Sequence, residues 1–288
     1  WQLLNAAPIA HRFNCPVVCD LRQADLAAGG QGAPITPLAD WILFRAAHEP
    51  VVVINLGGFC NITVLPGEQS CGDGVSPMTL IRGMDVCACN HLLNEAARVA
   101  LGEPFDRDGA AALRGSLVPD ATETLIQRLQ AQHHESRSLG TGDERAGWLD
   151  ELTQRLARNH IRPDDLLATV VESVGRCIGH AVRDGFVALT PEHAMDEQAQ
   201  EQAPHARVIA AGGGARNEAL LAAIARTATC PVRRSDAVGV PVECREAMGM
   251  AVLGALAQDG VPVTLPQVTG RGASIAPDGC WWRHGVAR

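Results

Sequence analysis

The segment Val51-Val-Val-Ile-Asn-Leu-Gly-Gly58 joins a short apolar run to a glycine turn, and Val208-Ile-Ala-Ala-Gly-Gly-Gly214 repeats that arrangement. Residues 51–54 and 208–211 are β-prone and short enough to be buried strands, so both turns follow the carboxyl end of a strand. Open α/β sheets bind their ligands at such ends. Glycine allows close backbone approach and leaves N–H groups pointing outward, which suits phosphate. With a third turn at Gly29-Gly-Gln-Gly32, the sequence predicts a nucleotide-handling α/β protein.

The composition excludes several classes of function. The chain has 288 residues, 47% of them hydrophobic and 19% charged, and a formal net charge of −8. All 24 basic residues are arginine, because the sequence contains no lysine. A Walker P-loop, a protein-kinase strand lysine and a pyridoxal Schiff base are therefore excluded. The acidic balance and the lack of a basic cluster longer than Arg233-Arg234 make nucleic acid an unexpected partner.

No apolar run reaches the length needed to cross a membrane, and residues 1–5 show no features of a signal peptide. We therefore expect a cytoplasmic protein without a membrane partner. The ten cysteines include no C-x-x-C pair, so we expect buried packing rather than disulfides or a metal site, and no metal ligand is assigned.

Hydrophobic periodicity and end signals predict the elements in outline. We expect strands at 16–19, 51–54, 62–65, 208–211 and 231–233, and helices at 37–47, 90–101, 121–133, 148–158, 164–183, 217–227 and 245–257. Asn90 is expected to cap the helix that follows it. Residues 190–204 are acidic and Gln-rich, which predicts a mobile surface insertion.

Ten ordered blocks of residues carry a resemblance to a known family. They are Val18-Cys-Asp-Leu-Arg22, Asp25 with Gly29-Gly-Gln-Gly-Ala-Pro34, Asn55-Leu-Gly-Gly-Phe-Cys-Asn61, Gly83-Met-Asp85 with Asn90, Pro104-Phe-Asp-Arg-Asp108, Ser138-Leu-Gly140, Asp165-Leu-Leu-Ala-Thr169, Gly212-Gly-Gly-Ala-Arg-Asn217, Glu246-Ala247 and Leu265-Pro-Gln-Val-Thr-Gly270. In these blocks the chain resembles the anhydro-N-acetylmuramic acid kinase family of the actin, sugar-kinase and Hsp70-like ATPase superfamily.

The resemblance implies an α/β fold: an RNase H-like, actin-like ATPase domain with a mixed sheet flanked by helices. Residues 1–270 would form the carboxyl-terminal kinase lobe and 271–288 a tail. Because the family pattern is already under way at residue 1, the amino-terminal lobe, with its Ser-Gly-Thr-Ser-x-Asp-Gly phosphate loop, is expected to be missing. The implied reaction uses ATP, Mg²⁺ and water to convert 1,6-anhydro-N-acetylmuramic acid to N-acetylmuramic acid 6-phosphate, as a step of peptidoglycan recycling. A second copy of the chain, forming a homodimer, is a further candidate partner.

The resemblance also implies two catalytic carboxylates. Asp85 would be the base that activates water to attack the anomeric carbon, while the alternative is that Asp85 only caps the following helix. Glu246 would face the catalytic water, although the helix dipole alone would favour a carboxylate there.

The glycine turns would hold the nucleotide and the sugar. The nucleotide-binding residues implied are Asn55, Gly57, Gly58, Asn61, Gly212, Gly213, Gly214 and Asn217. The residues expected to face the sugar are Asp20, Arg22, Gly30, Gln31, Gly32 and Asn90. The plain alternatives are a tight hairpin at Gly57–Gly58, a strand-to-helix connection at Gly212–Gly214 and a surface ion pair between Arg22 and Asp25. Asp106 and Asp108 are expected in a solvated loop.

A second function stays open beside the kinase. A truncated or diverged homologue could bind ligand in a regulatory role without phosphoryl transfer. A Rossmann oxidoreductase is disfavoured, because the triple glycine lacks the G-x-G-x-x-G order and lies late in the chain.

Overall fold

The computed structural model describes residues 4–69, 74–134, 138–140, 142, 147–189, 207–272 and 279–282. The chain divides into two compact units, of which one comprises Trp1–Leu43 with Glu246–Arg288 and the other Phe44–Arg245. In the described ranges, no helix has the length and apolarity required to span a bilayer.

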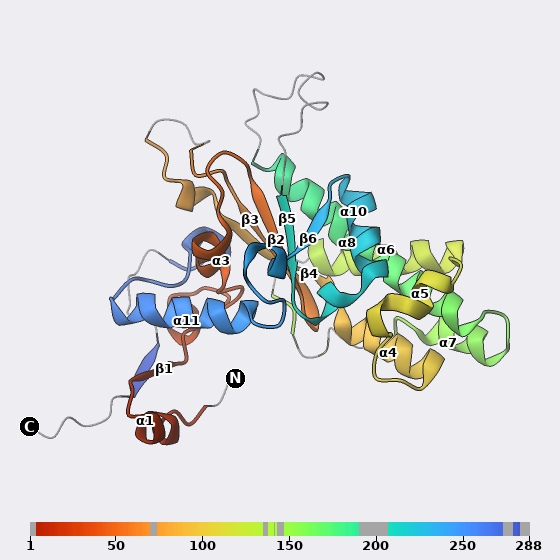
Figure 1. Cartoon of the computed structure of the whole chain (residues 1–288), viewed down its shortest axis with the longest axis horizontal. Helices are drawn as coiled ribbons and strands as arrows, with labels where there is room; N and C mark the ends of the chain where they lie inside the picture. Colours follow the sequence, from red (N-terminus) through yellow and green to blue (C-terminus); the bar gives the residue numbers. More distant parts are fainter. Residues whose placement is uncertain are drawn as a thin grey trace, which may run out of the picture. The chain divides into compact units, whose positions relative to one another are not determined.

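A five-stranded mixed sheet forms the centre of the larger unit (Figure 1). Its strands are β2 (Val51–Leu56), β3 (Phe59–Leu65), β4 (Arg82–Ala88), β5 (Arg207–Ala211) and β6 (Val232–Arg234). They lie in the order β4-β3-β2-β5-β6; β2, β3 and β4 are antiparallel neighbours, whereas β5 and β6 run parallel to β2. An antiparallel meander extended by parallel strands is the RNase H-like arrangement, so the predicted fold class is confirmed.

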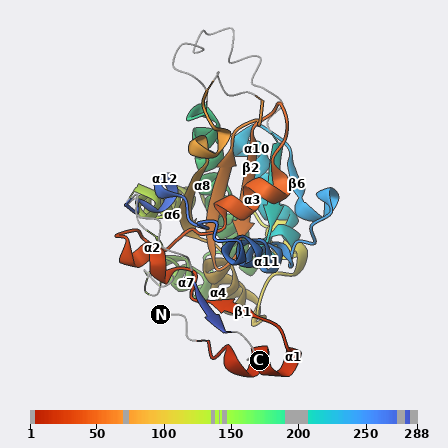
Figure 2. The same cartoon turned by 90° about the vertical axis from the view of Figure 1, so that its left-hand side faces the viewer.

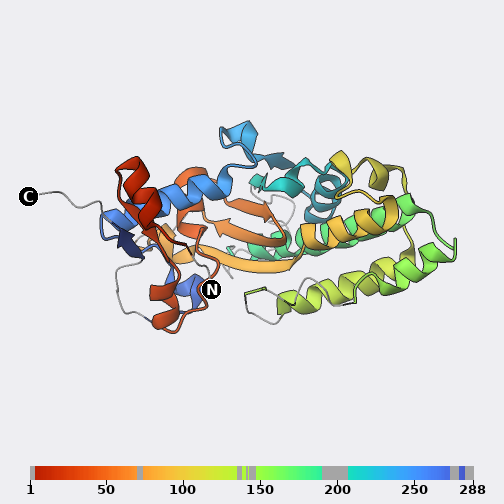
Figure 3. The ribbon, with the colours of Figure 1, turned by 90° about the horizontal axis from the view of Figure 1, so that it is seen from below.

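One face of this sheet packs against helices. The helices of the larger unit are α4 (Asn90–Leu101), α5 (Ala110–Arg114), α6 (Pro119–His134), α7 (Asp150–Ala157), α8 (Pro163–Val187) and α10 (Glu218–Ala228), with short 3₁₀ turns η1 (Pro77–Leu80), η2 (Arg107–Gly109), η4 (Gly213–Arg216) and η5 (Ser235–Val238). Alternate residues of β2, namely Val52, Ile54 and Leu56, share one buried core with α8. In Figure 3 the ribbons of α4 (orange) and α8 (green) run alongside each other.

Two glycines of α8 allow α10 to pack closely on it. A Cβ at Gly175 would clash with the Cβ of Ala223, and a Cβ at Gly179 would lie 3.0 Å from Cγ2 of Thr227. Both partners belong to α10. Because close-packed interiors tolerate little added volume, these glycines set the distance between the two helices.

The smaller unit has its own small core. Its elements are α1 (Ala7–Phe13), β1 (Val17–Cys19), α2 (Gln23–Ala27), α3 (Pro37–Phe44), α11 (Arg245–Gln258), α12 (Pro266–Thr269) and β7 (Cys280–Trp282). Strands β1 and β7 pair antiparallel, as Figure 2 shows. Leu21, Leu38, Leu253 and Val263 are buried together.

Most of the predicted elements are present with shifted ends, and two strands, β4 and β7, were not predicted. The expected strand 62–65 begins at Phe59, and the expected helix 37–47 ends at Phe44. Arg82–Ala88 is a strand because its pairing with β3 outweighs the weak β propensity of Gly83 and Asp85. The insertion expected at 190–204 lies outside the described residues, as do 273–278 and 283–288 of the expected tail.

Candidate functional site

A row of polar side chains crosses one face of the sheet. Asp85 of β4 pairs with Asn61 of β3, Asn61 pairs with Asn55 of β2, and Asn55 pairs with Ala211, the last residue of β5. Directly paired residues point to the same face of a sheet, so this row leads from the Asp85 carboxylate to the start of the triple glycine. Asp85, Asn61 and Asn55 are half-buried.

An irregularity in strand register marks the same place. The pairing of β3 with β4 shifts between Cys60 and Asn61. Such bulges redirect side chains and occur often beside active sites. Here the shift places Asp85 opposite Asn61, on the face away from the helix-packed core.

The hairpin bend between β2 and β3 caps helix α4 with its backbone. The Gly57 carbonyl accepts a hydrogen bond from the Asn90 amide at 3.0 Å, and the Gly58 carbonyl accepts from the amides of Cys89 and His91 at 2.9 and 3.2 Å. The first N–H groups of a helix have no partner within it, so these carbonyls satisfy them. The expected side-chain cap at Asn90 is therefore wrong: Asn90 is the first residue of α4, and its side chain bonds elsewhere.

The Asn90 side chain lies between the two glycine turns. Its Nδ2 donates to the Leu56 carbonyl at 2.9 Å. A Cβ at Gly214 would lie 2.9 Å from Asn90 Oδ1 and 2.8 Å from Leu56 Cβ, whereas one at Gly213 would be 3.7 Å from Asn90 Nδ2. Gly212 has a φ of +85° and approaches the Leu56 carbonyl. The turns at Gly57 and Gly213 are therefore neighbours in space.

The triple glycine leads into α10 through a capping residue. Asn217 is the N-cap of α10, and its side chain accepts a hydrogen bond from the Leu220 amide at 3.0 Å. The prediction that Asn217 opens this helix is confirmed. Gly109 of η2 packs against the Asn217 side chain so closely that a Cβ there would clash.

The Asp85 carboxylate is held by a loop far away in sequence. The Leu139 amide donates to its Oδ2 at 2.8 Å. Asp85 lies within β4, so the alternative that it caps the following helix is wrong.

Asp106, which was expected in a solvated loop, has a structural role. Its two carboxylate oxygens accept from the amides of Ala111 and Ala112, both at 2.9 Å, and so cap α5. That part of the expectation is wrong. Asp108 is exposed, with φ of 57°. The loop borders a cavity of about 420 Å³ that is separate from the polar row.

The smaller unit carries the other predicted residues. Arg22 donates to the Gly32 carbonyl. Asp20 is exposed with φ of +63°, a conformation that aspartate tolerates better than most residues. Glu246 is exposed in the first turn of α11.

Asp25 organises the first glycine turn, a role that the sequence reasoning missed. It is fully buried, and its carboxylate accepts from the Gly32 amide at 2.8 Å and the Thr269 hydroxyl at 2.6 Å. The Gln31 amide donates to the Thr269 carbonyl at 3.0 Å, and Gly30 leaves no room for a Cβ beside Asp25. An aspartate a few residues before a glycine turn was the available signal.

The larger unit thus brings together ten of the predicted residues. They are Asn55, Gly57, Gly58, Asn61, Asp85, Asn90, Gly212, Gly213, Gly214 and Asn217. The remaining predicted residues belong to the smaller unit. They are Asp20, Arg22, Gly30, Gln31, Gly32 and Glu246.

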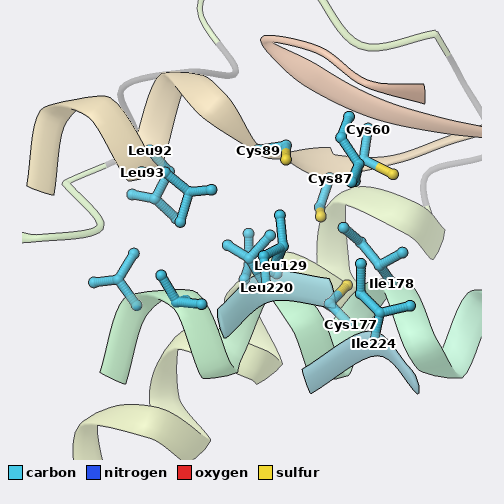
Figure 4. Packing of buried hydrophobic residues seen from close by; sticks show 14 of the residues in the cluster. Cys60, Cys87, Cys89, Leu92, Leu93, Leu129, Cys177, Ile178, Leu220 and Ile224 are labelled. Carbon is cyan, nitrogen blue, oxygen red and sulfur yellow. The ribbon is translucent and has the colours of Figure 1, made fainter. Parts of the chain in front are cut away.

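Four cysteines near this region are core residues. Cys60, Cys87, Cys89 and Cys177 are buried among leucines and isoleucines (Figure 4). Burial raises the pKa of the Cys89 thiol to about 12 and raises that of Cys60 well above its usual range. The Cys60 and Cys89 thiols therefore stay protonated at neutral pH and pack as small apolar side chains. Cys15, Cys244 and Cys280 are exposed, so for these three the expectation of buried packing is wrong.

Comparison with known proteins places the chain in context. The sequence profile of the family described as "Anhydro-N-acetylmuramic acid kinase" matches residues 1–276. A protein of that name from Gloeobacter violaceus is 35% identical over 277 residues, which cover 95% of this chain and 66% of the relative. One from Salinibacter ruber is 32% identical, covering 94% of this chain and 64% of the relative. The chain therefore spans about two thirds of the length of these relatives.

Among solved structures, an activator of the 2-hydroxyisocaproyl-CoA dehydratase from Clostridium difficile with bound ADPNP is similar at a TM-score of 0.42 and 14% identity. The match covers 79% of this chain and 68% of the activator.

Proposed function

The chain belongs to the anhydro-N-acetylmuramic acid kinase family, and we propose that it takes part in the ATP-dependent conversion of 1,6-anhydro-N-acetylmuramic acid and water to N-acetylmuramic acid 6-phosphate. The observation that carries this proposal is the row Asp85–Asn61–Asn55, which joins a carboxylate to two adjoining glycine turns on one sheet face. A proton acceptor beside phosphate-binding backbone is what the reaction requires.

The orientation of the hairpin bend supports a role in phosphate binding. The carbonyls of Gly57 and Gly58 point at the start of α4. A trans peptide holds its N–H opposite to its C=O, so the amides of Gly58 and Phe59 point away from α4. Backbone amides directed out of a glycine bend suit phosphate oxygens. The turn at Gly212–Gly214 would then contact the nucleoside, since it adjoins this bend.

Asp85 suits the proton transfer in the proposed reaction. The water oxygen would form a bond to the anomeric carbon while the bond from that carbon to the bridging O6 breaks. O6 would accept the γ-phosphoryl group as ADP leaves, and the proton lost by water would pass to Asp85. The Leu139 amide holds Oδ2 at 2.8 Å and so fixes the direction of the carboxylate. Glu246, in the smaller unit, stays a predicted catalytic carboxylate.

The donor set also suits a nucleotide-bound Mg²⁺. The side-chain amide oxygens of Asn61 and Asn55 in the row are hard ligands of the kind that Mg²⁺ prefers beside substrate phosphates, and they would hold the ion while Asp85 accepts the proton. When bound, the ion would neutralise charge on the transferring phosphoryl group.

Calorimetry on the purified chain tests the proposal. We expect heat of binding with ATP and Mg²⁺ and with the anhydro sugar, and formation of ADP and sugar 6-phosphate when both are present. The Asp85→Asn variant should bind both ligands without turnover. Binding of the sugar without turnover by the unmodified chain would support the regulatory alternative, and no binding of either ligand would overturn the proposal.

A further inference from the structure

Asn90 makes contacts in two directions at the point where the glycine turns meet. Its side-chain Nδ2 donates to the carbonyl of Leu56, the last residue of β2, at 2.9 Å, and its backbone amide donates to Gly57 at 3.0 Å. Its Oδ1 faces Gly214 on the other side, where a Cβ would lie only 2.9 Å away. The half-buried amide group therefore fills the space between both turns.

The Leu56 carbonyl is the shared element of this arrangement. It accepts from Asn90 and also lies against Gly212, where a Cβ would approach it to 2.8 Å. The peptide between Leu56 and Gly57 is planar, so fixing this carbonyl also fixes the Gly57 amide at the entry to the bend. A substitution at Asn90 would therefore alter the conformation of both the hairpin bend and the triple glycine.

From these contacts we infer that Asn90 is a positioning residue for the nucleotide: it sets the spacing between the hairpin bend at Gly57–Gly58 and the turn at Gly212–Gly214. This role differs from the expectation that Asn90 faces the sugar, and the two roles predict different effects on sugar binding. The inference rests on the proposed function for its ligand, but the coupling of the two turns is a property of the free protein.

The packing explains why small residues surround Asn90. Gly214 has no side chain where the Asn90 amide lies, and Gly58 has none where the His91 ring lies, since a Cβ there would come within 2.8 Å of His91 Cδ2. His91 also contacts Phe59 edge to face, with ring centroids 5.1 Å apart. The first two residues of α4 thus pack against the glycine turns, Asn90 against Gly214 and His91 against Gly58.

Asn90→Asp is the sharpest test because it keeps the shape of the side chain and removes the Nδ2 donor. A carboxylate oxygen would then face the Leu56 carbonyl. The matched control is Asn94→Asp, one turn further along α4 and outside both turns. We expect Asn90→Asp to weaken binding of Mg-ATP by about tenfold, the size of one lost hydrogen bond, and to leave sugar binding unchanged. Asn94→Asp should bind both ligands like the unmodified chain.

Hydrogen exchange of the ligand-free protein gives a second readout. Peptides covering 55–60 and 211–217 should both exchange faster in Asn90→Asp and at the original rate in Asn94→Asp. Unchanged exchange in either peptide would overturn the inference, as would loss of sugar affinity with intact ATP affinity. If the unmodified chain bound no nucleotide, the proposed function would fail, and the role of Asn90 in coupling the turns would still be decided by exchange.

Discussion

The Leu139 amide lies 2.8 Å from Oδ2 of Asp85, although the two residues are 54 positions apart. This hydrogen bond connects strand β4 to the loop around Ser138-Leu-Gly140. A neutral amide donor fixes the direction of a carboxylate without supplying a positive charge. Under the proposed function, this hydrogen bond would orient Asp85 for proton transfer.

The first prediction concerns Asp85→Asn. The amide oxygen of asparagine can accept the Leu139 N–H, so the fold should be retained and the melting temperature little changed. Turnover should fall by about 10²- to 10⁴-fold, since the base is lost. Coupled ADP release measures turnover, and calorimetry measures the affinity for Mg-ATP. Undiminished turnover would show that the base is another residue.

A second prediction separates two adjacent glycines. At Gly214 a Cβ would lie 2.8 Å from Leu56 Cβ and 2.9 Å from Asn90 Oδ1, whereas at Gly213 the nearest atom is 3.7 Å away. Gly214→Ala should therefore lower the free energy of unfolding by about 1–3 kcal/mol through overpacking. Gly213→Ala should fold normally and weaken nucleotide binding, because its methyl group would be added to the proposed contact surface.

Urea unfolding and nucleotide titration of both variants check this prediction. A Gly213→Ala protein with normal stability and normal nucleotide affinity would remove that turn from the site. Equal destabilisation by the two substitutions would contradict the packing described here.

The sequence predicted strands β2 and β5 and the two glycine turns of the site, although not β4, because the patterns of β2, β5 and the turns are local. A β-branched run followed by glycine identifies β2 and β5, and an asparagine before a helical pattern identifies the cap at Asn217. Their meeting at one place follows from parallel pairing, since Asn55 is in register with Ala211. For the two glycine turns, position at the end of a strand was therefore enough to predict that they meet.

The contacts of Asn90 and Asp25 could not be predicted in the same way. Asn90 has the sequence context of a helix cap, but backbone carbonyls from a distant hairpin take that role and leave its side chain for Leu56. Asp25 accepts from Thr269, 244 positions away. Hydrogen bonds of this range depend on tertiary packing, for which a single sequence carries no local pattern.

A third prediction concerns thiol reactivity. Burial raises the pKa of Cys60 and Cys89, and a hydrogen bond with Cys177 together with burial raises that of Cys87. Alkylation requires the thiolate. In the folded protein at pH 7.5 (about physiological), iodoacetamide should modify the exposed Cys15 and Cys244 and spare these three. Peptide mass spectrometry before and after denaturation measures the difference. Rapid modification of Cys89 in the native state would contradict its place in the core.

The last prediction concerns acid stability and Glu172 of α8. Its side chain is 8% exposed; Oε1 accepts from Arg176 at 2.7 Å, and Oε2 pairs with Arg226 of α10. Burial opposes ionisation, but the hydrogen bonds from Arg226 and Arg176 outweigh it and lower the pKa of Glu172 below 4.5. A lowered folded-state pKa stabilises the protein above the unfolded value, and this contribution is lost as the pH falls through the folded value.

Glu172→Gln should therefore cost about 1–3 kcal/mol of unfolding free energy at neutral pH, because hydrogen bonds to a charged partner are lost. Arg226 loses its counter-charge, whereas Arg176 keeps its ion pair with Glu123. The difference between the variant and the unmodified chain should shrink as the pH falls below 4.5, since the unmodified side chain then becomes neutral as well. Urea unfolding midpoints of both proteins, measured from neutral to acidic pH, test whether the stability difference shrinks in acid. A difference that stays constant or grows in acid would show that Glu172 contributes through packing and not through its charge.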